Sequence, residues 1–123
     1  MNTLCVPYTN VILYTDVEPV DVYKGCHIDY RGIEVTPETF VNVLLGNSSS
    51  PSLHRKVLQS TGNDRVSVNF IDHGSRGKVY FPTMKPLSAS KLKETMEIMY
   101  EKNMYKELVF YMEACESGPM FFG

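Results

Sequence analysis

Leu-Val-Phe-Tyr-Met-Glu-Ala-Cys-Glu-Ser-Gly, residues 108–118, is the stretch that decides the fold. Its first five residues are apolar in succession, which predicts a strand that is covered on both faces and is therefore central in a parallel sheet. Cys115 follows this strand after two residues. Open parallel sheets carry their reactive groups at the carboxyl ends of the strands, so we expect Cys115 to lie where such a sheet performs chemistry.

A second strand and a helix precede this stretch. Residues 65–71 alternate apolar and polar side chains, as a strand does. A helix that Ser88 or Ser90 caps follows, and its apolar side chains recur three and four apart, at Leu92, Met96, Met99 and Tyr100. A strand, a helix and a strand form a βαβ unit with parallel strands.

The first strand of this unit ends at Asp72-His73-Gly74. Parallel neighbours lie about 5 Å apart and end at one edge. We therefore expect His73 and Cys115 to leave the sheet at the same edge.

The remaining chain predicts fewer elements. Residues 10–15 favour a strand, residues 21–32 irregular chain, and residues 77–82 a short extended segment. A helix is predicted to begin after the capping residue Thr36, with Pro37 and Glu38 in its first turn, and to end at Gly46.

Composition limits the classes of function. With 123 residues and a net charge of −2, the chain fits one domain and gives no reason to expect nucleic acid or an anionic membrane as partner. No apolar run could be inserted in a membrane, and no signal peptide is visible, which favours a cytoplasmic chain, although a truncated secreted protein would look the same. Asn47-Ser48-Ser49 is a glycosylation candidate, but a plain flexible loop is favoured.

The cysteines do not indicate a metal or a cofactor. The spacing of Cys5, Cys26 and Cys115 does not match that of zinc ligands or of a redox dithiol. Cys26 and His27 could form one pair of metal ligands, but the sequence offers no convincing second pair. We therefore expect no bound metal and no cofactor.

A thiol and an imidazole at one sheet edge favour acyl transfer. An imidazolium stabilises the thiolate, so Cys115 would attack a carbonyl and His73 would protonate the leaving amine. The backbone N–H groups of Gly74 and Cys115 are candidates to stabilise the oxyanion. The competing interpretation is structural, because a lone cysteine is often buried and a lone histidine after a strand is often only a satisfied polar residue.

Two blocks carry a resemblance to a known family. Residues 70–75, Phe-Ile-Asp-His-Gly-Ser, and residues 109–118 resemble the legumain family, the asparaginyl endopeptidases. Upstream stretches at residues 21–25, 29–32 and 35–37, with Met99-Tyr100 and Met104-Tyr105-Lys106, extend the similarity in the family's order over about five-sixths of the chain.

This resemblance implies an α/β fold, a caspase-like three-layer sandwich with a mostly parallel sheet, and a cysteine endopeptidase that acts after asparagine. It assigns the nucleophile to Cys115, its partner to His73, an oxyanion donor to Gly74, part of the asparagine pocket to Glu113 and a succinimide-forming position to Asp72. The partners implied are peptide or protein substrates with asparagine before the cleaved bond. The compartment implied is the lysosome, the vacuole or the secretory route.

The chain also departs from the family pattern. We expect residues 1–123 to be a partial peptidase domain that lacks the N-terminal strand region and the C-terminal part of the specificity pocket. An incomplete sheet exposes its edges, so self-association through them is expected. The alternatives are an inactive fragment or splice product that acts at most as a binding module, and a transamidase-type relative on the same scaffold.

Overall fold

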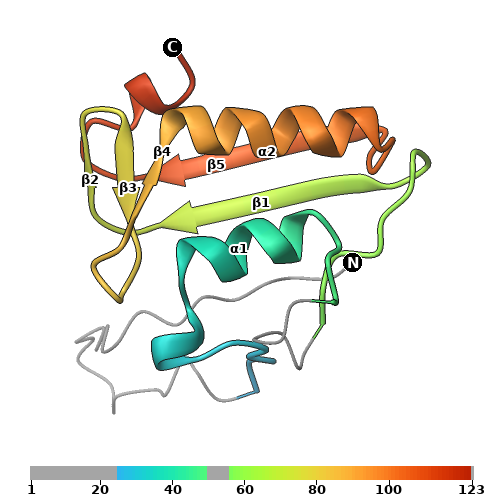
Figure 1. The fold of residues 1–123 in the computed structure, drawn as a ribbon, viewed down its shortest axis with the longest axis horizontal. Helices are drawn as coiled ribbons and strands as arrows, with labels where there is room; N and C mark the ends of the chain where they lie inside the picture. Colours follow the sequence, from blue (N-terminus) through green and yellow to red (C-terminus); the bar gives the residue numbers. More distant parts are fainter. Residues whose placement is uncertain (1–24, 50–55, 123) are drawn as a thin grey trace, which may run out of the picture.

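The computed structural model describes residues 25–49 and 56–122 (Figure 1). In chain order, the elements in this part are η1 (Gly32–Glu34), α1 (Pro37–Leu44), β1 (Arg65–Ile71), β2 (Gly74–Ser75), β3 (Lys78–Tyr80), β4 (Pro86–Ser88), α2 (Ala89–Glu101), β5 (Glu107–Glu113) and η2 (Gly118–Met120). The strand predicted for residues 10–15 lies outside the described residues. Within the described ranges, we find no helix with the length and apolar character that crossing a bilayer requires.

The first helix begins and ends where its sequence signals predict. The Thr36 hydroxyl accepts a hydrogen bond from the Thr39 N–H at 3.1 Å, and Pro37 occupies the first helical position. This cap satisfies one of the N–H groups that a helix start leaves without an intrahelical partner. Gly46 follows the helix with a φ of +65°, a left-handed conformation that glycine adopts without strain.

The two long strands form the predicted parallel pair. β1 and β5 run in register from Arg65 opposite Glu107 to Ile71 opposite Glu113, and α2 lies between them in sequence. The βαβ unit is therefore confirmed. An ion pair of 2.7 Å between Arg65 Nε and Glu107 Oε2 joins the two strand starts.

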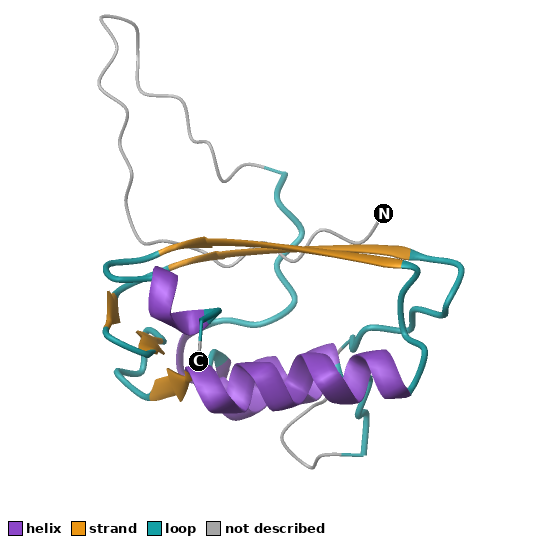
Figure 2. Cartoon of the chain, turned by 90° about the horizontal axis from the view of Figure 1, so that it is seen from above, coloured by secondary structure: helices purple, strands orange, loops and turns teal. Residues whose placement is uncertain are grey.

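Both helices cover the same face of this sheet, as the edge-on view in Figure 2 shows. The Phe40 ring of α1 packs against Phe70 of β1 and Phe110 of β5, with ring centroids 6.0 and 6.4 Å apart. Met99 of α2 belongs to the second buried cluster, which partly buries Val68 of β1. The core of the described part thus lies between one sheet face and one helical layer.

Two expectations about this packing are wrong. The strand β5 was expected to be covered on both faces, but Val109 and Tyr111 are 44% and 62% exposed. In the described part it has β1 as its one strand neighbour, and its expected central position is not tested because the predicted strand of residues 10–15 lies outside the described residues. These side chains alternate in burial with Phe110 and Met112, so they face the side of the sheet that no helix of the described residues covers (Figure 2). An apolar run therefore marked a strand correctly without showing which of its faces is covered.

The second error concerns Tyr100, which was expected on the inner face of α2 but is 74% exposed. The buried residues of the helix are Leu92, Thr95 and Met99. The Thr95 hydroxyl donates to the Lys91 carbonyl oxygen at 2.7 Å, so this polar side chain is satisfied inside the core. Tyr100 lies about 100° around the helix from Met99, which turns it toward solvent.

A small antiparallel sheet, β2-β3-β4, stands at the carboxyl end of β1 (Figure 1). It confirms a short extended segment within residues 77–82, and it buries Val79 and Leu87 in the main core. The residues that follow β1 are therefore held by a second sheet.

Candidate active site

The strand register brings His73 and Cys115 to one edge of the sheet. Ile71 pairs with Glu113 at the end of the ladder, and each residue of interest follows its strand by two positions. The Asp72 N–H donates to the Glu113 carbonyl oxygen at 3.2 Å, so the two segments stay side by side just beyond the paired strands. Both residues therefore lie at the edge of the sheet that the carboxyl ends of β1 and β5 form, which we call the rim.

Gly74 lies directly against the backbone of Cys115. A Cβ on Gly74 would overlap the carbonyl oxygen of Cys115 and would stand 3.3 Å from its amide nitrogen. A methyl group in this position would also approach the Ala114 Cβ to 3.0 Å. Glycine is therefore the residue type that fits here without displacing the neighbouring chain.

The hairpin ladder orients the Gly74 amide. The Tyr80 N–H donates to the His73 carbonyl oxygen at 2.9 Å, and Gly74 stands opposite Val79 in the next pair. Hydrogen-bonded and non-bonded pairs alternate along an antiparallel ladder, so the Gly74 N–H points away from β3. The Gly74 N–H is therefore not engaged by the hairpin ladder.

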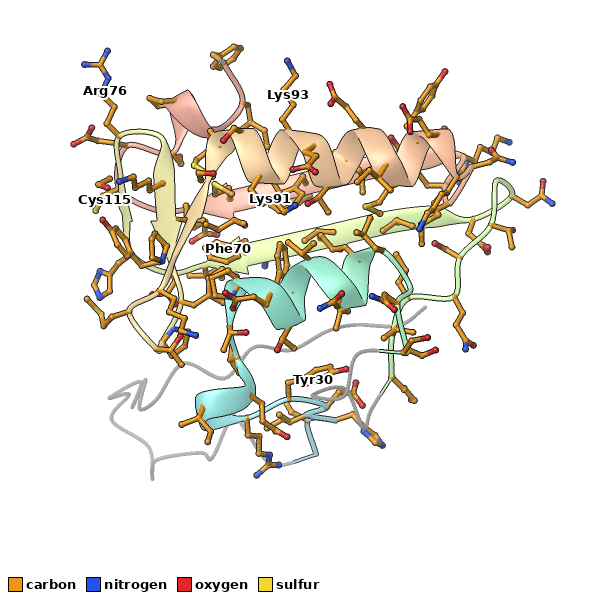
Figure 3. The ribbon with its side chains drawn as sticks, in the orientation of Figure 1. Tyr30, Phe70, Arg76, Lys91, Lys93 and Cys115 are labelled. Carbon is orange, nitrogen blue, oxygen red and sulfur yellow. The ribbon has the colours of Figure 1, made fainter. Side chains whose placement is uncertain are left out.

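The side chains of His73 and Cys115 are both exposed, and Figure 3 shows Cys115 beside the β2–β3 hairpin. In the described part of the chain, no hydrogen bond joins the imidazole to the thiol. Catalytic pairs are often loose without a substrate and tighten when one binds. The geometry is that of a shared rim rather than of a closed pair.

Asp72 contacts the amide that follows it. Its Oδ1 accepts a hydrogen bond from the His73 N–H at 2.7 Å. Succinimide formation requires this backbone nitrogen to reach the side-chain carboxyl carbon of the aspartate. The Asp72 carboxylate and this backbone nitrogen are thus hydrogen-bonded neighbours.

Glu113 ends β5 with its side chain exposed on the uncovered face of the sheet. A shallow cavity of about 430 Å³, lined mainly by α1, β3 and β4, lies elsewhere and includes none of the predicted site residues. The Glu113 carboxylate is thus exposed at the end of β5.

The glycosylation candidate is remote from this rim. Asn47 is exposed after α1, its Nδ2 donates to Asn42 Oδ1 at 2.9 Å, and its Oδ1 accepts from the Ser49 N–H at 3.2 Å. As for metal ligands, the described ranges hold no group of three or more His, Cys, Asp or Glu side chains that could bind an ion.

Sequence reasoning missed the hairpin turn beside the rim. Ser75 pairs with Lys78, which makes Arg76-Gly77 a two-residue turn, and Arg76 is exposed there. The signal was present, since a glycine in a two-residue connection between short extended segments is typical of a hairpin.

Comparison with known proteins gives one family match and a series of related chains. The model of the peptidase C13 family matches residues 3–123. Rat legumain is 47% identical over 102 residues, which cover 81% of this chain and 23% of that protein. The hemoglobinase of Schistosoma japonicum is 41% identical over 111 residues, which cover 90% of this chain and 25% of that protein.

A plant relative shows the same pattern. The vacuolar-processing enzyme delta-isozyme of Arabidopsis thaliana is 41% identical over 104 residues, which cover 84% of this chain and 22% of that protein. The chain therefore spans about a quarter of the length of these curated relatives. The parallel pair and the small antiparallel sheet fit an incomplete α/β fold of the caspase-like type.

Proposed function

This chain belongs to the peptidase C13 family, and from that premise we propose that it carries the nucleophile and histidine of a cysteine endopeptidase that cleaves peptide bonds after asparagine. One observation supports the proposal above the others: the β1–β5 register and the Gly74–Cys115 contact gather a thiol, an imidazole and two backbone amides at one rim. These groups are the components that acyl transfer requires.

In the proposed reaction, the Cys115 thiolate attacks the carbonyl carbon of the cleaved bond. His73 stabilises the thiolate as imidazolium and then donates its proton to the leaving amine. The N–H groups of Gly74 and Cys115 donate to the oxyanion of the tetrahedral intermediate. Water then attacks the acyl-enzyme while His73 takes up one of its protons, and the carbon–sulfur bond breaks to release the carboxyl product and restore the thiolate and the imidazolium.

Glu113 is the proposed acceptor for the substrate carboxamide. An asparagine side chain both donates and accepts hydrogen bonds, so a pocket for it needs opposed polar groups. The Glu113 carboxylate supplies the acceptor, and the donor would come from outside the described residues. The Asp72–His73 contact supports Asp72 as a site of succinimide formation.

The proposal extends to partners and compartment. The substrates would be peptides or proteins with asparagine before the cleaved bond, and the compartment would be the lysosome, the vacuole or the secretory route. The name of the Arabidopsis relative contains the word vacuolar, which supports the second of these. Asn47 would carry a glycan on that route, because its side chain is exposed.

The test compares a fluorogenic peptide with asparagine before the reporter to the same peptide with alanine. We expect the wild-type chain to cleave the asparagine peptide, Cys115→Ala to cleave neither, and the matched control Cys26→Ala to retain the wild-type rate. His73→Asn should lower kcat by at least about a hundredfold, as loss of a general acid–base group does. Equal rates for the wild type and Cys115→Ala would refute the proposal.

A second candidate function is a binding module without catalytic activity. Two observations favour it: the absence of a thiol–imidazole hydrogen bond in the described part, and the uncovered sheet face with exposed Val109 and Tyr111. The discriminating measurement is the rate at which iodoacetamide alkylates Cys115 relative to Cys26. An activated thiolate would react faster than Cys26, whereas a binding module would show similar rates for both thiols.

A further inference from the structure

The β2–β3 hairpin carries a positive charge close to the rim. It starts at Gly74, which lies against Cys115, and its turn residue Arg76 follows two positions later. Two extended residues span at most about 7 Å, so the backbone of Arg76 stays near that of Gly74. Figure 3 shows Arg76 and Cys115 on the same end of the molecule.

Among the described residues, no ion pair neutralises the charge of Arg76. In the described ranges, ion pairs join Arg65 to Glu107 and Lys91 to Glu94, and neither includes Arg76. A guanidinium presents several N–H donors in a planar fork that matches a carboxylate. Arg76 can therefore bind an acidic group without first losing a partner.

The position of the hairpin relative to Glu113 determines which residues of a bound substrate would contact the hairpin. Glu113 faces the uncovered side of the sheet, whereas the hairpin descends from the strand ends on the side of the helices (Figure 2). Cys115 follows Glu113 by two residues, and its backbone lies against Gly74, the first residue of the hairpin. A peptide whose asparagine is held at Glu113 thus continues past the thiol toward the hairpin with the residues that follow the cleaved bond.

We propose that Arg76 is a specificity-determining residue that favours substrates with an aspartate or glutamate side chain just after the cleaved bond. The inference rests on the proposed peptidase function for the direction of the substrate. It adds a substrate class to that function, since a neutral hairpin turn would be indifferent to acidic side chains.

Nearby carboxylates act in the opposite direction. Glu113 precedes Cys115 by two residues and Glu116 follows it, and both side chains are exposed. Both carboxylates repel an acidic group. The sign of the net electrostatic potential at the thiol therefore does not reveal the contribution of Arg76 alone. The test must therefore measure the difference that Arg76 makes against an otherwise unchanged surface.

The first experiment uses Cys115 as a probe of local charge. The purified chain is alkylated with anionic iodoacetate or with neutral iodoacetamide, and mass spectrometry gives the ratio of the two rates at Cys115 and at Cys26. We expect Arg76→Gln to lower the ratio of the iodoacetate rate to the iodoacetamide rate at Cys115 by about two- to threefold at low ionic strength, and to leave the ratio at Cys26 unchanged. The Coulomb energy between two unit charges about 7–10 Å apart in water corresponds to a change of that size in a rate. Added salt should remove the difference.

The matched control is Lys93→Gln. Lys93 is an exposed cation of α2 that points away from the hairpin in Figure 3, so its loss changes the net charge equally without touching the rim. A ratio at Cys115 that is the same in the wild type and Arg76→Gln overturns the inference. An equal fall in Lys93→Gln overturns it as well, because net charge would then be the cause.

The second experiment separates this inference from the proposed function. Peptides that differ only in the residue after asparagine, aspartate or serine, are compared by kcat/KM. We expect the wild type to prefer aspartate and Arg76→Gln to lose at least about half of that preference; an unchanged preference overturns the inference. If the wild type cleaves no peptide, the proposed function fails, and the alkylation ratio still decides whether Arg76 draws acidic groups to the rim.

Discussion

Gly74 and Cys115 lie backbone against backbone, so closely that a single methyl group on the glycine would overlap the cysteine carbonyl oxygen. This contact joins two segments that are 41 positions apart in the sequence. It fixes the segment after β5 against the hairpin that follows β1. The position of the thiol on the rim therefore depends on a residue that carries no side chain.

Gly74→Ala tests this dependence. We expect the added methyl group to displace the segment around Cys115, to lower the free energy of unfolding by about 1–3 kcal/mol, and to change the alkylation rate of Cys115. Gly118→Ala is the matched control, because a Cβ there meets no atom within 4 Å and the residue does not have a positive φ. If both variants unfold at the same urea concentration as the wild type, the contact has no structural importance.

The sequence predicted best where local chemistry and periodicity agree. Thr36, Pro37 and Gly46 set both ends of α1, and the alternation of residues 65–71 marked β1 with its observed bounds. A long connection with a helix allowed only a parallel pairing of β1 with β5, so the shared rim of His73 and Cys115 followed from topology. These features depend on neighbours in the chain.

The features that the sequence did not predict depend on distant neighbours. Val109 and Tyr111 are apolar and lie in a strand, yet their exposure depends on whether another element covers that face. Thr95, a polar residue, lies on the buried side of α2 whereas Tyr100 does not, and a hydrogen bond within the helix satisfies the Thr95 hydroxyl. The close approach of Gly74 to Cys115 likewise appears only when both strands are placed.

The ring cluster around Phe70, near the carboxyl end of β1, supports the fold. Phe70 is 7% exposed, and its ring centroid lies 5.3 Å from that of Phe81 and 6.0 Å from that of Phe40. We expect Phe70→Ala to lower the free energy of unfolding by about 3–5 kcal/mol, which is a large part of the stability of a small domain. Far-ultraviolet circular dichroism in urea measures the loss.

Two further variants make this prediction decisive. Phe70→Leu removes less volume and should cost about 1–1.5 kcal/mol, so it reports on packing even if the alanine variant does not fold. Phe122→Ala should be nearly neutral, since that side chain is 83% exposed. Equal midpoints for the leucine variant and the wild type would show that the rings do not hold the sheet.

Stability should fall in acid partly because of Asp64. Hydrogen bonds from the Thr61 backbone N–H and then from its hydroxyl, at 2.8 and 2.9 Å, lower the pKa of Asp64 below its ordinary value of 3.8. The folded chain then binds this proton less readily than the unfolded chain. The stabilisation is present above pH 3.8 and is lost as the pH falls through the lower pKa of the folded state.

Urea unfolding at a series of pH values from about 5 to about 2.5 measures this loss, and that window brackets the ordinary carboxyl value. We expect Asp64→Asn to show a shallower fall of stability with pH than the wild type. Thr61→Val keeps the backbone donor, the larger cause, and should lie between the two. A fall that is as steep in Asp64→Asn as in the wild type would assign the acid sensitivity to other groups.

The uncovered face of the β1–β5 sheet should make the chain associate with itself. Val109 and Tyr111 are exposed there, Ile71 on the neighbouring strand is 44% exposed, and in the described part each strand has the other as its one partner. Apolar side chains beside unpaired strand edges favour pairing with another copy. A lysine on this face repels a second copy and is solvated without cost to the buried core.

We therefore expect Val109→Lys to shift the chain toward monomer in analytical ultracentrifugation, with a dissociation constant raised by at least about tenfold, which corresponds to about 1.4 kcal/mol. Tyr100→Lys is the control, because it places the same charge on α2, at a side chain that is 74% exposed and outside the sheet. If only the helix variant reduces association, α2 rather than the sheet forms the contact. If the wild type is monomeric at every concentration, the uncovered face does not drive self-association, and the binding-module function loses one of its two supports.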